Sequence, residues 1–135
     1  MKCRRSTVWL IWALFLLPLL VVSQSITEVL PNFRTSPRYA WLNQLYAMNR
    51  AQPMWISNIA LQQEFLRVLQ QAPSVGLNTN DYSYEFLKSY AAGFSLQTRT
   101  DSLEADIRFT DAALYFFTSL FAGKKTPEFY YTGLS

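Results

Sequence analysis

The sequence predicts an all-α protein, a compact bundle of about four short helices behind an N-terminal apolar segment. Two observations support this fold class. Apolar side chains recur three and four residues apart along most of the chain, which is the period of a helix that buries one face. Short connections with proline or glycine separate these stretches, as they do between neighbouring helices of small bundles.

Residues 1–23 carry a targeting pattern. The basic head MKCRR precedes an uncharged apolar run over residues 8–22, and small residues follow the run. These features are typical of a secretory signal peptide, which we expect to be cleaved after Ser23. The alternative is an uncleaved membrane anchor, because about 20 apolar residues span a bilayer. In both cases the positive-inside rule places the rest of the chain outside the cytoplasm, in the periplasm or envelope, and any membrane contact is made by this segment alone.

The charge balance argues against a nucleic-acid partner. The full chain has 12 basic and 9 acidic residues, and three of the basic ones lie in residues 1–23. The remainder therefore has no net charge, whereas phosphate-binding proteins gather a basic surplus on one face.

The chain has no histidine, and its single cysteine is Cys3, ahead of the apolar run. After signal removal it therefore has no thiol nucleophile, no disulfide, and neither the usual general base nor the commonest metal ligand. We expect no cofactor, no metal and no catalytic residue.

Residues 24–35 contain Pro31 and no helical period, which predicts a linker or an extended lead-in. A helical domain is predicted over residues 36–127, with a tail at 128–135. The first helix should have Ser36 as N-cap and Pro37 at its first position, and Pro53 should end it. The residues expected to face the core are Trp41, Leu45 and Met48.

The second helix should follow Ser57 and Asn58 and end at Pro73 and Gly76, with Gln62 on its polar face. Its expected core face is Leu61, Phe65, Val68, Leu69 and Ala72. The third should span residues 83–92 and stop at Gly93, with Phe86, Leu87 and Tyr90 facing inward.

Between these two helices, Gly76, Leu77, Asp81 and Tyr82 form a turn motif. We interpret Gly76 as a left-handed helix end, and Asp81 as a cap or a side-chain-to-backbone hydrogen bond for the third helix, rather than as ligand-binding residues.

The fourth helix shows the clearest pattern. Asp101 and Glu104 have capping-box spacing, and Gly123 should end the helix. Its expected inward stripe is Leu103, Ile107, Thr110, Leu114, Phe117 and Phe121.

Two candidate sites have a functional and a structural interpretation. Asp106 and Asp111 could form an acid/base pair for glycan hydrolysis, but they are five residues apart and diverge around a helix, so one inward hydrogen-bonding group is favoured. The second candidate is an aromatic platform that could stack on a sugar, but packing in the core is favoured for its residues, Tyr46, Pro53, Met54 and Trp55. Phe129, Tyr130 and Tyr131 in the tail indicate a docking edge for another domain, or a frayed end.

Four stretches in order, LYAMNRAQPMW (45–55), GLNTNDY (76–82), EADIRFTDAAL (104–114) and FAGKKTP (121–127), form one pattern. It resembles the scaffold domain near the N-terminus of the large L,D-transpeptidases of the bacterial envelope, over residues 42–127. The motif positions are Tyr46, Pro53, Trp55, Gly76, Leu77, Asp81, Tyr82, Thr110, Asp111, Gly123 and Pro127.

The resemblance implies a helical platform for a downstream catalytic domain that uses a cysteine and a histidine to cross-link peptidoglycan. Because no histidine and no cysteine follow residue 3, we expect this chain to be a non-catalytic module in cell-wall assembly, either a truncated product or a stand-alone scaffold. The implied partners are a transpeptidase catalytic domain or other envelope proteins, and peptidoglycan. A membrane-anchored helical adaptor and a small carboxylate-based glycan hydrolase are the alternatives.

Overall fold

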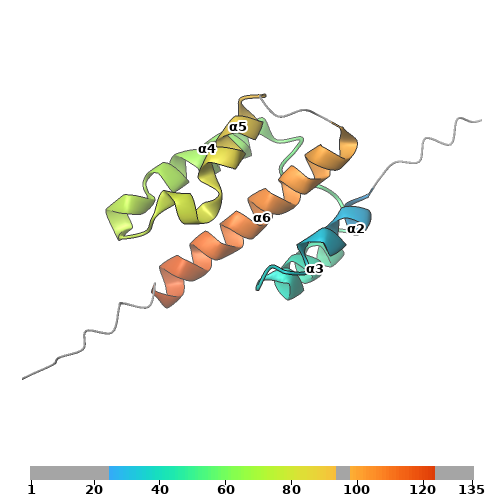
Figure 1. Cartoon of the computed structure of the whole chain (residues 1–135), viewed down its shortest axis with the longest axis horizontal. Coiled ribbons are helices and arrows are strands. Elements are labelled where there is room, and N and C mark those ends of the chain that lie inside the picture. The colour runs from blue at the N-terminus through green and yellow to red at the C-terminus, as the bar shows by residue number, and fades with distance from the viewer. Residues whose placement is uncertain (1–24, 94–97, 124–135) are drawn as a thin grey trace, which may run out of the picture.

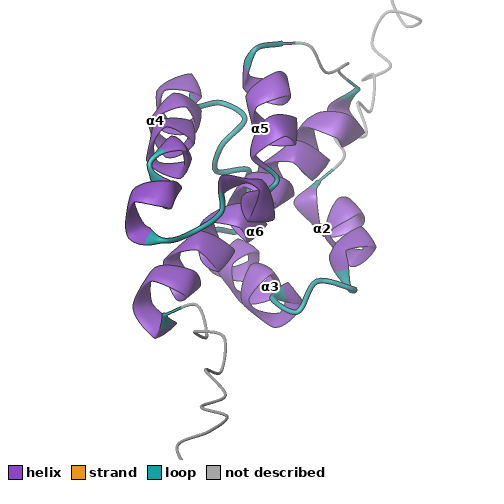
Figure 2. Cartoon of the chain, turned by 60° about the vertical axis from the view of Figure 1, so that its left-hand side comes forward, coloured by secondary structure: helices purple, strands orange, loops and turns teal. Residues whose placement is uncertain are grey.

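One long helix, α6 (Arg99–Ala122), runs through the middle of the domain. The computed structural model describes residues 25–93 and 98–123. Helices α2 and α3 lie on one side of α6, and α4 and α5 lie on the other (Figure 1). Within the described ranges the regular structure is helical throughout, without a strand (Figure 2), which confirms the all-α fold class. None of the helices in those ranges is both long and apolar enough to span a membrane.

The chain is already folded before residue 36, where a linker was expected. Helix α2 (Ile26–Val29) is followed by the 3₁₀ helix η2 (Leu30–Phe33). Ser25 is the N-cap of α2, and its hydroxyl accepts a hydrogen bond from the Thr27 N–H at 3.1 Å. Ile26, Val29 and Leu30 are buried, at helical spacing on one face. The linker prediction was wrong because Pro31 was taken as a breaker, whereas it occupies the first turn of η2, where its missing N–H costs nothing.

Helix α3 (Tyr39–Met48) starts later than expected and buries a different face. Arg38 is the N-cap, whereas Ser36 was predicted. The buried residues are Leu42 and Tyr46. Of the expected core residues, Trp41 is 50% exposed and Met48 is 74% exposed.

Helix α4 (Ile59–Gln70) begins as predicted, because the Asn58 side-chain oxygen accepts a hydrogen bond from the Leu61 N–H at 3.0 Å. Phe65 and Leu69 are buried as expected. The expected core residue Leu61 is exposed, and Gln62, placed on the polar face, is buried instead.

The turn after α4 confirms the prediction for Gly76. The 3₁₀ helix η3 (Ala72–Val75) ends at Gly76, whose φ of 77° lies in the left-handed region that glycine adopts without strain. The N–H of Leu77 then donates to the Ala72 carbonyl at 3.0 Å, and the Leu77 side chain enters the core.

The following elements are η4 (Thr79–Tyr82) and α5 (Tyr84–Ala91). Asn78 caps η4, and Ser83 is the N-cap residue of α5. Asp81 lies inside η4, so the prediction that it caps the third helix was wrong. Helix α5 buries Leu87 together with Tyr84, whereas Phe86 remains 39% exposed.

Helix α6 begins with a capping box between Thr98 and Asp101, where Asp101 and Glu104 had been expected. It ends at Gly123, as predicted. The N-terminal half of the expected stripe is buried, but Phe117 and Phe121 are exposed. A second face of α6 carries buried Phe109, Ala112 and Phe116.

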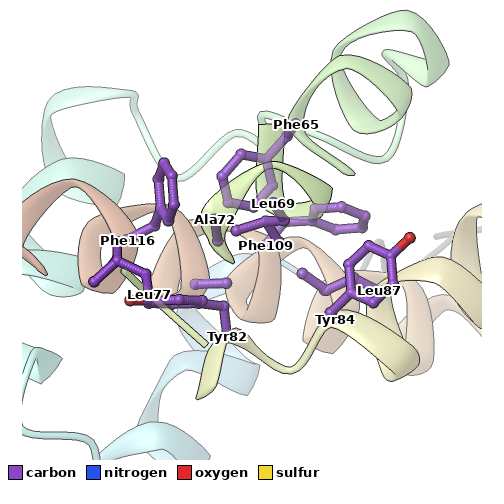
Figure 3. Close-up of a cluster of buried hydrophobic side chains, with 10 residues drawn as sticks. Phe65, Leu69, Ala72, Leu77, Tyr82, Tyr84, Leu87, Phe109 and Phe116 are labelled. Atoms are coloured by element: carbon purple, nitrogen blue, oxygen red, sulfur yellow. The ribbon is translucent and has the colours of Figure 1, made fainter. Parts of the chain in front are cut away.

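The core therefore consists of two clusters, one on each side of α6. The α4/α5 side holds ten buried residues, nine of them labelled in Figure 3. There the Phe109 ring lies near Trp55, Phe65 and Tyr90, at centroid distances of 5.2, 6.5 and 6.3 Å. The other cluster joins α2 and α3 to the N-terminal half of α6 through Leu42, Leu103 and Ile107.

Candidate functional site

A fully buried carboxylate, Asp106, lies in the middle of α6. Its Oδ2 accepts hydrogen bonds from three successive backbone N–H groups, those of Met54, Trp55 and Ile56, at 3.0, 2.7 and 3.0 Å. Its Oδ1 accepts a hydrogen bond from the Tyr46 hydroxyl at 2.7 Å and a second one from the Met54 N–H at 3.1 Å. Asp106 thus binds both the end of α3 and the α3–α4 connection to α6.

The local sequence explains why three N–H groups converge on one carboxylate. Arg50 and Ala51 both have φ of 55°, so the chain turns sharply after α3, and the Ala51 N–H donates to the Tyr46 carbonyl at 2.7 Å. Pro53, which has no N–H, immediately precedes the three donors. The connection therefore presents N–H groups as a small nest, a geometry that suits a negative charge.

Trp55 is held through all three of its polar groups. Besides its backbone N–H on Asp106, its indole Nε1 donates to the Thr110 hydroxyl at 2.9 Å, and its carbonyl accepts from Gln62 Nε2 at 2.9 Å. Its ring stacks on Phe109 at 5.2 Å. Together, Tyr46, Trp55, Gln62, Asp106 and Thr110 are called the Asp106 network below.

Burial, and then the neighbouring Asp106 carboxylate, raise the pKa of the Tyr46 phenol far above its ordinary value of 10.0. A neutral Tyr46 donates to Asp106, and its oxygen lies 2.8 Å from the Thr110 hydroxyl, which completes the network. Because the carboxylate oxygens are already occupied by backbone and phenol donors, the arrangement serves to position the chain and leaves no acceptor site for a substrate proton.

The raised pKa of Tyr46 predicts a loss of stability at alkaline pH. Above pH 10.0 the unfolded chain releases this proton while the folded domain retains it, so the free energy of unfolding falls as pH rises and is unaffected below that pH. Each further pH unit should cost about 1.4 kcal/mol from this one group.

Guanidinium unfolding from pH 8 to 11.5 measures the effect, with Tyr46→Phe as the reference that lacks it. The variant should be less stable by about 1 to 2 kcal/mol at pH 8, and this difference should shrink above pH 10. Parallel curves for the two proteins would contradict the assignment.

The second carboxylate, Asp111, belongs to a different contact. Its Oδ1 accepts from the Ser36 hydroxyl at 2.8 Å and from Arg38 Nε at 2.9 Å, and Arg38 Nη2 is 2.7 Å from its Oδ2. This pair, with side chains about one fifth exposed, ties the start of α3 to α6. Asp106 and Asp111 therefore diverge around the helix, as the spacing predicted.

A surface hollow of about 310 Å³ lies beside this ion pair, lined by the end of η2, the loop that follows it and α6. It contains two carboxylates, Glu104 and Asp111, and two guanidinium groups, Arg38 and Arg108. The Arg108 guanidinium lies 4.8 Å from the Phe86 ring centroid. The hollow is thus balanced in charge.

The structure brings some of the predicted motif residues together and separates others. Tyr46, Trp55 and Thr110 meet in the Asp106 network, with Pro53 next to it, which confirms core packing for these aromatic residues. Leu77 and Tyr82 lie in the cluster on the α4/α5 side, where the Tyr82 hydroxyl is buried without a hydrogen-bond partner among the described residues. Pro127 and the tail aromatics lie outside the described residues.

Sequence reasoning missed two members of this site. Gln62 was assigned to a solvated face, and Arg38 was not assigned a role; both are bound to partners that the helical period does not identify. One inward hydrogen-bonding group was expected on this helix without being assigned to Asp106, and the three backbone donors to Asp106 were not predicted. The sequence signal that could have indicated these donors is Pro53 followed by three residues that each carry a backbone N–H group.

The fold and the Asp106 network define a helical domain whose buried polar groups join its own helices, as in a structural platform. A model of the Scaffold domain family matches residues 40–134. The match covers most of the chain, which therefore belongs to the Scaffold domain family. No curated protein and no solved structure matches the chain.

Proposed function

We propose that this chain is the scaffold part of an L,D-transpeptidase-type protein that is exported to the bacterial cell envelope, where it supports peptidoglycan cross-linking without catalysing it. The family match over residues 40–134 includes all four motif stretches that carry the resemblance to those enzymes. Its partners in this role are a transpeptidase catalytic domain and, through it, peptidoglycan.

The observation that carries the proposal is the use of the motif residues. Tyr46, Trp55 and Thr110 are bound in the Asp106 network, and Gly76 reverses the chain at the end of η3. The motif therefore encodes a way of joining helices, which is what a platform requires. A cysteine and histidine pair of the kind used in transpeptidation is not present after residue 3.

The test mixes the purified full chain with sacculi, alone and together with an L,D-transpeptidase catalytic domain from the same genome. The muropeptides are then analysed by mass spectrometry. We expect no new cross-link and no released fragment from the chain alone, and saturable binding of the catalytic domain with more cross-links in the mixture.

The matched control is Asp111→Asn, which removes the only carboxylate of the two that is accessible to solvent. Fragments released by the chain alone, and lost in this variant, would establish a glycan hydrolase and overturn the proposal. Absence of any binding to the catalytic domain would overturn the proposal that this domain is the partner.

A further inference from the structure

An apolar groove lies between α3 and α6. It has a volume of about 260 Å³ and is lined by Trp41, Gln44, Leu45, Met48 and Leu114, which include one polar and no charged side chain. Leu114 continues along α6 into Phe117 and Phe121, three and seven residues further on the same face. The name α3/α6 groove is used below for this whole apolar surface, that is, the five lining residues together with the rings of Phe117 and Phe121.

Apart from Gln44, the residues that line the α3/α6 groove are ones whose helical spacing predicted burial. Trp41 and Met48 are 50% and 74% exposed, and Phe117 and Phe121 are 48% and 89% exposed. The apolar residues of α3 and those of α6 each have helical spacing, which is typical of a helix face that packs against a partner. Folded single domains seldom leave contiguous apolar patches of this kind uncovered.

We propose that residues 127–134 of the same chain pack into the α3/α6 groove. The family match runs to residue 134, so this segment belongs to the domain and is not merely a connection to something else. It contains Phe129, Tyr130, Tyr131 and Leu134 among eight residues, with one charge, Glu128. Its apolar side chains therefore match the uncharged lining of the groove.

The chain length fits this path. Helix α6 ends at Gly123, whose φ of 65° takes the chain out of the helix. Leu114 lies nine residues before Gly123, which is about 14 Å along the helix axis. An extended segment covers about 3.3 Å per residue, so residues 127–134 are long enough to run back past Phe121 and Phe117 to Leu114 and Met48.

Site-specific photo-crosslinking in the full chain, in intact cells, tests the proposal. The photoreactive residue p-benzoylphenylalanine replaces Met48, because a side chain that is 74% exposed can be exchanged at little cost in stability. The control carries it at Gln63, an exposed position of α4 on the other side of α6. Trypsin cuts after Arg38, Arg50 and Lys125, so a cross-link should join the peptide of residues 39–50 to the peptide that begins at Thr126.

We expect this peptide pair from position 48, in a band of monomer size, and not from position 63. The double substitution Phe129→Ser with Tyr131→Ser should reduce its yield several-fold while the helix content by circular dichroism stays unchanged. Cross-links from position 48 to residues 1–23, to a second copy in a dimer-sized band, or to another protein would each assign a different occupant and overturn the proposal. Absence of any cross-link would also overturn it.

Discussion

Replacing Asp106 with alanine should destabilise the domain by about 3 to 5 kcal/mol, because it removes the shared acceptor of three backbone N–H groups and the Tyr46 hydroxyl. A domain of this size has a free energy of unfolding of roughly 5 to 15 kcal/mol, so the loss is a large part of the total. The midpoint of thermal unfolding should fall by at least about 12 °C. Circular dichroism at 222 nm as a function of temperature measures it.

Two further variants separate the carboxylate's shape from its charge. In Asp106→Asn the amide oxygen can still accept from the three N–H groups, and its NH₂ can donate to the Tyr46 oxygen, with the Tyr46 hydroxyl turned toward Thr110. This variant should therefore lose less than Asp106→Ala. Asp111→Ala, on the same helix, should lose about 1 to 2 kcal/mol, because water replaces a partly exposed ion pair. If Asp111→Ala proved as costly as Asp106→Ala, the Asp106 network would not have the structural weight assigned to it.

The helical period predicted the number and approximate extent of the larger helices, but it predicted only part of the faces that they bury. Helix α6 shows the reason. It packs on α2 and α3 with Leu103 and Ile107 and on α4 and α5 with Phe109 and Phe116, so it has two buried faces. A search for one stripe finds only one of them, and it extended that stripe into exposed Phe117.

The face that α3 buries is set by a contact that local sequence does not contain. Tyr46 meets Asp106 across 60 residues of chain, and this bond turns Leu42 inward and Trp41 outward. Gln62 is buried for a similar reason, since its amide must reach the Trp55 carbonyl. By contrast, Asn58 and Gly76 were predicted correctly because a cap and a left-handed turn depend on neighbouring residues only.

The Asp106 network also connects the two clusters of the core. Tyr46 belongs to the cluster with α2 and α3, whereas Trp55 packs against the cluster with α4 and α5. Both are hydrogen-bonded to Asp106 or to Thr110, one turn later on α6. Loss of this carboxylate should therefore loosen both sides of α6 in one cooperative transition, not one side alone.

Replacing Phe109 with alanine should cost about 3 to 5 kcal/mol, the usual range for removing a fully buried phenylalanine ring. Its ring stacks on Trp55 at 5.2 Å and also lies beside Phe65 and Tyr90, so no single neighbour can move in to fill the cavity. Urea unfolding followed by circular dichroism at 222 nm measures the loss in free energy, because Trp9, Trp12 and Trp41 would also contribute to a fluorescence signal.

Phe86→Ala is the matched control, because it removes the same ring from a position that the sequence pattern placed in the core. Phe86 is 39% exposed, and the Arg108 guanidinium lies 4.8 Å from the centre of its ring. The control should cost about 1 kcal/mol, mainly through the lost cation–π contact and partial burial. Equal losses of stability in the two variants would contradict this assignment, because they would mean that Phe109 on α6 is no more important to the core than half-exposed Phe86 on α5.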